Sequence, residues 1–344
     1  MHVAVLGAGG FVGSHIVDRL LAEGETVTGL DREDTKLDTD RPGLTFHRMD
    51  VRDDPSLVDE VIARTDVVVD LVAYANPSIY VKAPLDVFDV NFRTNLDIAE
   101  RCVAHGRRLI QYSSAEVYGM FQGTDGLASE DSTPLSYGPI HKHRWIYACA
   151  KQLLERVLHA HGLAGSLEYT IIRPFNFVGP RMDYLVPAGT RGGPRVVPHF
   201  VSALLTVGPM YLVDGGDARR TFTHIDDATD AFMTVLRARE QSRNEIFNVG
   251  NPDNDLSMRE LAQLLMVIYE DLTGQPPDTE LLEIGGEEFY GEGYDDETRL
   301  PPDISKIAQL GWTPKYDLET TLRDTLLHHL LERDLLPSVE TLAE

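Results

Sequence analysis

The chain has 344 residues, 42% of them hydrophobic, which is enough for a full-sized core. Its formal net charge of -24 repels nucleic acid and anionic membranes, so neither is expected as a partner. Two cysteines do not form a disulfide framework, and no signal peptide or long apolar run is present, so we expect a cytoplasmic protein with no membrane span.

Short apolar segments alternate with helical patterns through the first half of the chain. The patterns predict strands at 3–6, 26–30, 44–48, 67–72, 108–113 and 169–173, and helices at 12–22, 57–63 and 87–105. The strand at 67–72 is almost wholly apolar, which is typical of a strand buried on both faces. This βα order predicts an α/β fold with a Rossmann-type, doubly wound parallel sheet.

The pattern changes after residue 178. Pro, Gly and Arg punctuate residues 179–198, as in a loop that lines a cleft, and helices are predicted at 258–271 and 320–333. We therefore expect a cofactor-binding domain at 1–178, with later elements at about 221–250 returning to it. Residues 179–344 are expected to form mainly a small substrate-binding lobe.

Glycines at 7, 10 and 13 follow the first strand and open the first helix, with the spacing GxxGxxG. A strand that ends this way points backbone N–H groups and a helix dipole at an anion, as a dinucleotide pyrophosphate requires. A glycine-rich turn without a ligand is the alternative. The cofactor contacts predicted here and at the fourth strand are Gly7, Gly10, Phe11, Val12, Gly13, Leu71 and Ala73.

Asp31 ends the second strand, about 20 residues beyond the glycines. A carboxylate there accepts both ribose hydroxyls and repels a 2′-phosphate, which favours NAD over NADP. Arg32 follows directly and weakens this preference. Asp50 and Val51, after the third strand, are placed to meet the adenine, although Asp50 could be an ordinary turn residue.

Tyr147 and Lys151 are four residues apart, so on a helix they share one face. An ammonium group near a phenol favours the phenolate, and such a tyrosine can take a proton from a sugar hydroxyl while hydride leaves the same carbon. Ser114, at the end of the preceding strand, supplies a hydroxyl to orient the substrate. A surface helix pair is the alternative reading of YxxxK.

Together these motifs resemble the extended short-chain dehydrogenase/reductase family, which includes sugar-nucleotide epimerases and dehydratases. The RPxN-like turn at residues 173–176 belongs to the same pattern, and the resemblance covers nearly the whole chain. It implies an NAD cofactor, catalysis by Tyr147 and Lys151, and contact between Asn176 and the substrate. It also implies a homodimer in which helices near 87–105 and 147–161 form a four-helix bundle.

Within the family, the run Ser114-Ala115-Glu116 separates the subclasses. It lacks the aspartate of the 4,6-dehydratases and carries a glutamate that 4-epimerases usually lack. UDP-glucuronate decarboxylases have a glutamate here, and the segments at 144–157, 214–216, 248–252 and 290–294 resemble the decarboxylase domain of the bifunctional polymyxin-resistance enzyme. That resemblance implies a catalytic role for Arg299 and a substrate-side role for Tyr294.

The expected activity is NAD-dependent oxidative decarboxylation of UDP-glucuronic acid, through a 4-keto intermediate, to a UDP-4-keto-pentose or UDP-xylose. Ala115 stands where the similar enzyme has a serine, so the group that protonates the sugar is left open. An NDP-sugar 4-epimerase or dehydratase and a non-catalytic NAD-binding regulator are the alternatives. Candidates for binding the diphosphate and uridine are Arg191, Arg195, Arg219 and Arg220.

Overall fold

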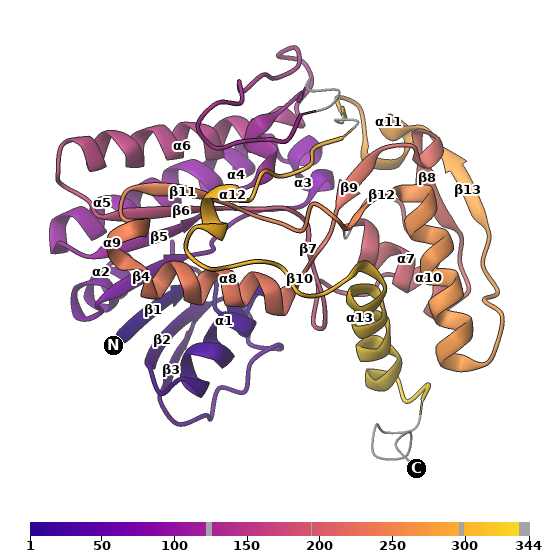
Figure 1. Ribbon diagram of the computed structural model, residues 1–344, viewed down its shortest axis with the longest axis horizontal. Helices are drawn as coiled ribbons and strands as arrows, with labels where there is room; N and C mark the ends of the chain where they lie inside the picture. The colour runs from indigo at the N-terminus through magenta and orange to yellow at the C-terminus, as the bar shows by residue number, and fades with distance from the viewer. Residues whose placement is uncertain (122–125, 194, 296–298, 337–344) are drawn as a thin grey trace.

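The computed structural model describes residues 1–121, 126–193, 195–295 and 299–336. A parallel sheet of seven strands forms its centre, in the order β11-β6-β5-β4-β1-β2-β3 (Figure 1). The strands are β1 His2–Leu6, β2 Thr26–Asp31, β3 Leu44–Arg48, β4 Val67–Asp70, β5 Arg108–Tyr112, β6 Tyr169–Pro174 and β11 Glu245–Val249. The predicted Rossmann-type doubly wound sheet is confirmed.

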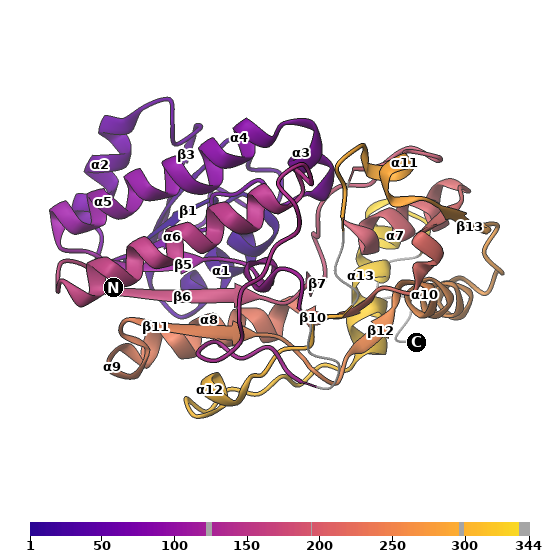
Figure 2. The same cartoon turned by 90° about the horizontal axis from the view of Figure 1, so that it is seen from above.

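Helices cover both faces of this sheet (Figure 2). One face carries α1 (Phe11–Ala22) and α8 (Ile225–Arg237), and the other carries α2 (Pro55–Arg64), α5 (Asn95–His105) and α6 (Trp145–Leu163). All residues of β4 and β5 are buried, because both of their faces are covered. This burial explains the continuous apolar run that predicted β4.

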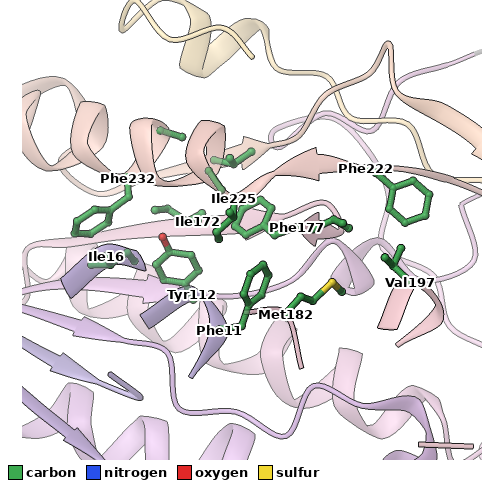
Figure 3. Close-up of a cluster of buried hydrophobic side chains, with 14 of the residues drawn as sticks. Phe11, Ile16, Tyr112, Ile172, Phe177, Met182, Val197, Phe222, Ile225 and Phe232 are labelled. Atoms are coloured by element: carbon green, nitrogen blue, oxygen red, sulfur yellow. The ribbon is translucent and has the colours of Figure 1, made fainter. Parts of the chain in front are cut away.

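The core between the sheet and α1 and α8 extends beyond the first half of the chain. Figure 3 shows Tyr112 and Ile172 from the sheet beside Phe232 from α8. At the other end of the same cluster lie Val197 and Phe222, which come from the second half of the chain. One hydrophobic core therefore joins the sheet to the elements that complete the cavity described below.

The second half of the chain adds three two-stranded pairings and several helices. The paired strands are β7 (Phe177–Val178) with β10 (Thr223–His224), β9 (Arg219–Thr221) with β12 (Asp255–Ser257), and β8 (Met210–Val213) with β13 (Leu281–Ile284). The helices are α7 Val196–Thr206, α9 Arg239–Ser242, α10 Met258–Thr273, α11 Gly286–Tyr290, α12 Ser305–Ala308 and α13 Leu318–Glu332. Two elements of this half, α8 and β11, lie with the large sheet. The division into domains at 1–178 and 179–344 stays a prediction. No helix in the described ranges is long and apolar enough to cross a bilayer.

Residues 87–105 are helical, as predicted, but the helix begins earlier and is not α-helical throughout. After the short helix α3 (Pro77–Lys82), α4 (Pro84–Phe88), a π-helical segment (Asp89–Thr94) and α5 (Asn95–His105) follow one another without a gap. A π-helical turn changes the direction of the side chains that follow it, and such turns are frequent at functional sites. Here, Asn91 and Asn95 are fully buried and donate hydrogen bonds to the backbone after β4.

Candidate active site

A cavity of about 1050 Å³ lies at the carboxyl ends of the central strands. Residues that follow β1, β4, β5 and β6 line one side, and residues of the second half of the chain line the other. Crevices at this edge of an open α/β sheet are the usual ligand sites of such folds. The size and position fit a dinucleotide together with a second ligand.

The glycine turn fits a bound pyrophosphate. A side chain on Gly13 would lie 2.0 Å from the carbonyl oxygen of Gly7, and one on Gly9 would lie 1.8 Å from that of Glu33, so neither position admits one. Helix α1 begins at Phe11 with no side-chain cap and no acidic residue in its first turn. Its first N–H groups are therefore available for an anion. The seven predicted contacts all line the cavity: Gly7, Gly10, Phe11, Val12, Gly13, Leu71 and Ala73.

Of the residues predicted to contact the adenosine half of the cofactor, only Arg32 lines the cavity. Arg32 lines the cavity, with its guanidinium carbon 5.8 Å from the centre of the Tyr74 ring. Asp31 accepts a hydrogen bond from Gly9 N at 2.9 Å, so its carboxylate also holds the glycine turn. Asp50 is paired with Arg52 at 2.7 Å, and Val51 packs into the core under β3. Neither lines the cavity, so a contact with adenine stays a prediction.

Tyr147 and Lys151 both face the cavity and are almost fully buried, with 4% and 1% of their surface exposed. This placement argues against a surface helix pair. Burial raises the pKa of Tyr147 to about 12, against the opposing effects of hydrogen bonds with Ser114 and Tyr80. Burial lowers the pKa of Lys151 to about 8, against the charges of Asp70 and Glu155. Lys151 Nζ donates to Asn95 Oδ1 at 3.3 Å and to Tyr112 O at 3.0 Å.

Two serines end β5 beside Tyr147. Ser114 accepts a hydrogen bond from Glu116 N at 3.1 Å and starts the short 3₁₀ turn Ala115–Tyr118. Ser113 Oγ is buried, faces the cavity and has no hydrogen-bond partner within the protein. A buried hydroxyl without a partner is costly unless a ligand satisfies it. This orphaned group is a second sign that the cavity is built to hold a polar ligand.

Glu116 lines the cavity and is bound by Arg144, with Arg144 Nη2 3.1 Å from Glu116 Oε1 and a second contact from Nη1. Arg144 is only 2% exposed and also lines the cavity. Arg144 was not among the predicted site residues. It stands three residues before Tyr147, at the entry to the helix, and this spacing was the available signal. The pair places a carboxylate and a guanidinium beside the proposed base.

Tyr80 is a second residue that sequence reasoning missed. It comes from α3, is 3% exposed, and its ring stacks on that of Tyr147 with centroids 4.5 Å apart. The Asn76-Pro77 pair is a readable helix start, and the Asn76 side chain does accept from Ser78 N. Nothing in the local sequence indicates which ring Tyr80 meets.

The structure divides the four candidate arginines. Arg195 and Arg220 line the cavity. Arg191 pairs with Glu288 at the surface, and Arg219 contacts Asp255 and Glu260. The predicted contacts Arg191 and Arg219 therefore do not line the cavity, whereas the other two candidates, Arg195 and Arg220, do. Successive residues of a strand point to opposite faces, which explains the choice between the two arginines of β9.

The remaining predicted substrate contacts also differ. Asn176 lines the cavity, with a left-handed backbone (φ 40°) and a hydrogen bond from its side chain to Thr221 O. Tyr294 lines the cavity, 7% exposed, and stacks on Tyr290 at 4.3 Å. Arg299 does not line it: its side chain is 48% exposed and bound to Asp255 at 2.8 Å. The next residue, Leu300, does line the cavity.

The NAD-dependent epimerase/dehydratase family model matches residues 3–250. The chain belongs to this family. It is therefore an enzyme that uses NAD, and the glycine turn and the unpartnered Ser113 hydroxyl fit that cofactor.

Curated relatives include UDP-D-apiose/UDP-D-xylose synthases from two plants. The Oryza sativa subsp. japonica protein is 39% identical over 95% of this chain and 88% of its own length. UDP-D-apiose/UDP-D-xylose synthase 1 of Arabidopsis thaliana is 38% identical over 95% of this chain and 90% of its own length.

Among solved structures, the PbgP3 protein of Burkholderia pseudomallei matches with a TM-score of 0.84 and 33% identity, over 95% of this chain and 96% of that one. MoeE5, solved with UDP-glucuronic acid and NAD, matches with a TM-score of 0.77 and 25% identity, over 98% of this chain and 100% of that one. The family predicted from the motifs is thus confirmed.

Proposed function

We propose that this enzyme is an NAD-dependent UDP-glucuronate decarboxylase that acts through a 4-keto intermediate. The observation that carries the proposal is the placement of Glu116 and Arg144 in the same cavity as Tyr147, Lys151 and Ser114. The names of the relatives support the same substrate class, because they make UDP-pentoses and one neighbour was solved with UDP-glucuronic acid.

The first chemical task is to remove the proton of the C4 hydroxyl. Tyr147 is the proposed base. The Ser114 side chain lowers its pKa against the effect of burial, and a protonated Lys151 one helical turn away would favour the phenolate as well. NAD, when bound, supplies the hydride acceptor for C4 and can return the hydride later. The buried position of Tyr147 excludes water from the proton transfer.

Oxidation at C4 places a ketone β to the C6 carboxylate. When the C5–C6 bond breaks and carbon dioxide leaves, the electron pair enters an enolate whose charge lies on the C4 oxygen. The hydroxyls of Ser114 and Ser113 can donate hydrogen bonds to that oxygen. C5 must then receive a proton. Ala115 offers none, and the proposed donor is a water molecule held by the Glu116–Arg144 pair in the cavity, with solvent supplying the proton that the overall reaction consumes.

An arginine must hold the uronate. Arg299, implied by the resemblance, is our proposal for this role, and binding would require it to leave Asp255 and turn past Leu300 toward the cavity. Arg144 is the alternative, since it already lines the cavity. The diphosphate is assigned to Asn176, Arg195 and Arg220, which all line the cavity.

The identity of the final product depends on what happens to the 4-ketone after decarboxylation. Release of the ketone gives UDP-4-keto-pentose, and its reduction gives UDP-xylose. The relatives' names favour a third product, UDP-apiose, as a candidate. Incubation with UDP-glucuronate and NAD should yield a UDP-pentose by mass spectrometry, and proton NMR should separate apiose from xylose, which have equal mass. A product of unchanged mass would mean an epimerase instead.

We further propose a cytoplasmic homodimer formed through α5 and α6. The two helices are adjacent (Figure 2), and α6 exposes Leu153, whose surface is 44% accessible. An apolar side chain at this position on two copies would support a four-helix bundle. Light scattering of the wild type and of Leu153→Glu tests the proposal, with a dimer expected only for the wild type.

A further inference from the structure

A buried carboxylate lies behind the Tyr147–Lys151 pair. Asp70 ends β4 and has none of its surface exposed. Its Oδ1 accepts a hydrogen bond from Val72 N at 2.9 Å, and its Oδ2 accepts one from Asn95 Nδ2 at 2.9 Å. It does not line the cavity, so no direct contact with a ligand accounts for it. A charge this deeply buried is costly unless it is paired.

The opposite charge closest to Asp70 in this network is that of Lys151, and the side-chain amide of Asn95 lies between the two. Asn95 donates from Nδ2 to Asp70 and to Val72 O, and these two acceptors fix the orientation of its amide. Its Oδ1 is thereby turned to Lys151 Nζ, at 3.3 Å. The chain of contacts runs from Asp70 through Asn95 to Lys151, and Lys151 is one helical turn from Tyr147.

We propose that Asp70 is a positioning residue for the reaction, which keeps Lys151 protonated and aims the Asn95 amide at it. This rests on the proposed function only for its link to turnover. In the motif YxxxK, the lysine favours the tyrosine phenolate only while its amine carries a positive charge. Lys151 is only 1% exposed, and burial of this kind favours loss of the proton. Asp70 offsets that tendency from the side opposite to the cavity.

The charges that act on Tyr147 are Glu116, which raises its pKa, and Arg195, which lowers it. A different set of charges acts on Lys151. Asp70 and Glu155 both raise the pKa of Lys151 against the larger effect of burial, and Glu155 is itself bound to Arg173 at 2.6 Å. Asp70 acts also on the thiol of Cys102 in α5, which burial keeps protonated. Burial raises the pKa of Asp70 to about 6, so the carboxylate is ionised over the neutral range in which Lys151 must hold its proton.

The test measures the Lys151 titration directly. The chain has six lysines, so protein labelled with ¹³C at the lysine ε carbon gives few signals, and Lys151→Arg identifies the one that matters. With NAD present, Asp70→Asn keeps the shape of the side chain and removes its charge, and it turns one of the two acceptor oxygens into a donor. We expect the Lys151 midpoint to fall by roughly one to two pH units, as for a charge of this kind at short range. An unchanged midpoint overturns the proposal.

Asp227→Asn is the matched control. Asp227 is equally buried, but its carboxylate accepts hydrogen bonds from Lys315 N and Tyr316 N, away from Lys151. This variant should lower stability and leave the Lys151 midpoint in place. Should Asp70→Asn fail to fold, Asp70→Ser is to show the same fall in midpoint, because it also removes the charge.

Turnover gives the second readout. The alkaline limb of kcat for carbon dioxide release from UDP-glucuronate should move to lower pH in Asp70→Asn by the same amount as the Lys151 midpoint. A uniform loss of kcat at every pH would indicate a purely structural role and contradict the proposal. Absence of carbon dioxide release by the wild type would refute the proposed function, while the NMR midpoints would still decide the role of Asp70.

Discussion

Tyr80 stacks face to face on Tyr147, with ring centroids 4.5 Å apart and ring planes 5° from parallel. The Tyr80 hydroxyl lowers the pKa of Tyr147 against the larger effect of burial. The proposed base is therefore held between a second phenol and the serine after β5.

Replacing Tyr80 with Phe keeps the stacked ring and removes the hydroxyl. We expect kcat to fall about tenfold and the limb of the pH profile that reports Tyr147 to move to higher pH, because a bond that favours the phenolate is lost. Steady-state rates from about pH 6 to pH 10 check this. Tyr269→Phe, on α10 outside the cavity, should match the wild type, and an identical profile for Tyr80→Phe would argue against the relationship.

Glu116→Gln separates chemistry from folding. If the carboxylate takes part in the proton transfers, kcat should fall about 10²- to 10⁴-fold with both substrates saturating. The same change removes the charged group of one partner of the buried Arg144, so urea denaturation should show a loss of about 1–3 kcal/mol. Glu130→Gln removes a carboxylate that caps Asn248 N outside the cavity, and it should keep kcat. A Glu116→Gln enzyme with normal kcat would remove Glu116 from the mechanism.

Arg299 and Arg219 both contact Asp255, and neither lines the cavity. If Arg299 turns inward to hold the uronate, Arg299→Ala should raise the KM for UDP-glucuronate at least about tenfold, equal to about 1.4 kcal/mol. Inhibition by UDP-glucose, which has no carboxylate, should not change. Arg219→Ala is the matched control and should leave both constants near wild type. Equal behaviour of the two variants would transfer the role to Arg144.

Arg173 in the RPxN-like turn is predicted to be structural. It is 3% exposed and binds Glu155 through two contacts, at 3.0 and 2.6 Å. Arg173→Met leaves Glu155 buried and unpaired, so unfolding free energy should fall by about 3–5 kcal/mol. Arg239→Met breaks an equally bidentate pair with Glu168 at the surface and should cost about 1 kcal/mol or less. Similar losses in urea titrations would contradict this assignment.

The burial of His15 is expected to make the folding stability of the protein depend on pH in the acid range. Burial, with the charge of Arg181, lowers the pKa of His15 to about 4, from an unfolded value of 6.5. Between these values the unfolded chain binds a proton that the folded chain does not, so His15 contributes stability that is complete above about pH 6.5 and is lost toward pH 4. His15→Gln should reduce the stability lost between these limits by roughly 1–2 kcal/mol. Urea titrations at several pH values check it, and parallel curves for the two proteins would refute it.

The sequence predicted the elements whose pattern is local. Three such features are apolar strands buried on both faces, the glycine turn before α1 and the spacing of Tyr147 and Lys151. Each is recognised from residues that lie close together in the sequence. The helix at 87–105 was predicted, but its π-helical segment was missed, because such a turn leaves the apolar pattern nearly unchanged while it turns Asn95 toward Lys151.

The site residues that sequence reasoning missed, or could not choose between, depend on tertiary contacts. Arg220 and Arg219 are neighbours of identical type, and only the pairing of β9 with β12 decides which one faces the cavity. Tyr80 reaches Tyr147 from a separate short helix, and Asp70 acts through Asn95 from another strand. In each case the partner is distant in the chain, so no local spacing could identify it.

The most direct measurement follows the C6 carbon of UDP-glucuronate. With ¹³C at that position and NAD present, NMR should show the label appearing in bicarbonate as fast as the sugar nucleotide is consumed, and Tyr147→Phe should abolish both. Label that stays in the nucleotide sugar, while C4 is inverted or oxidised, would contradict the decarboxylase assignment.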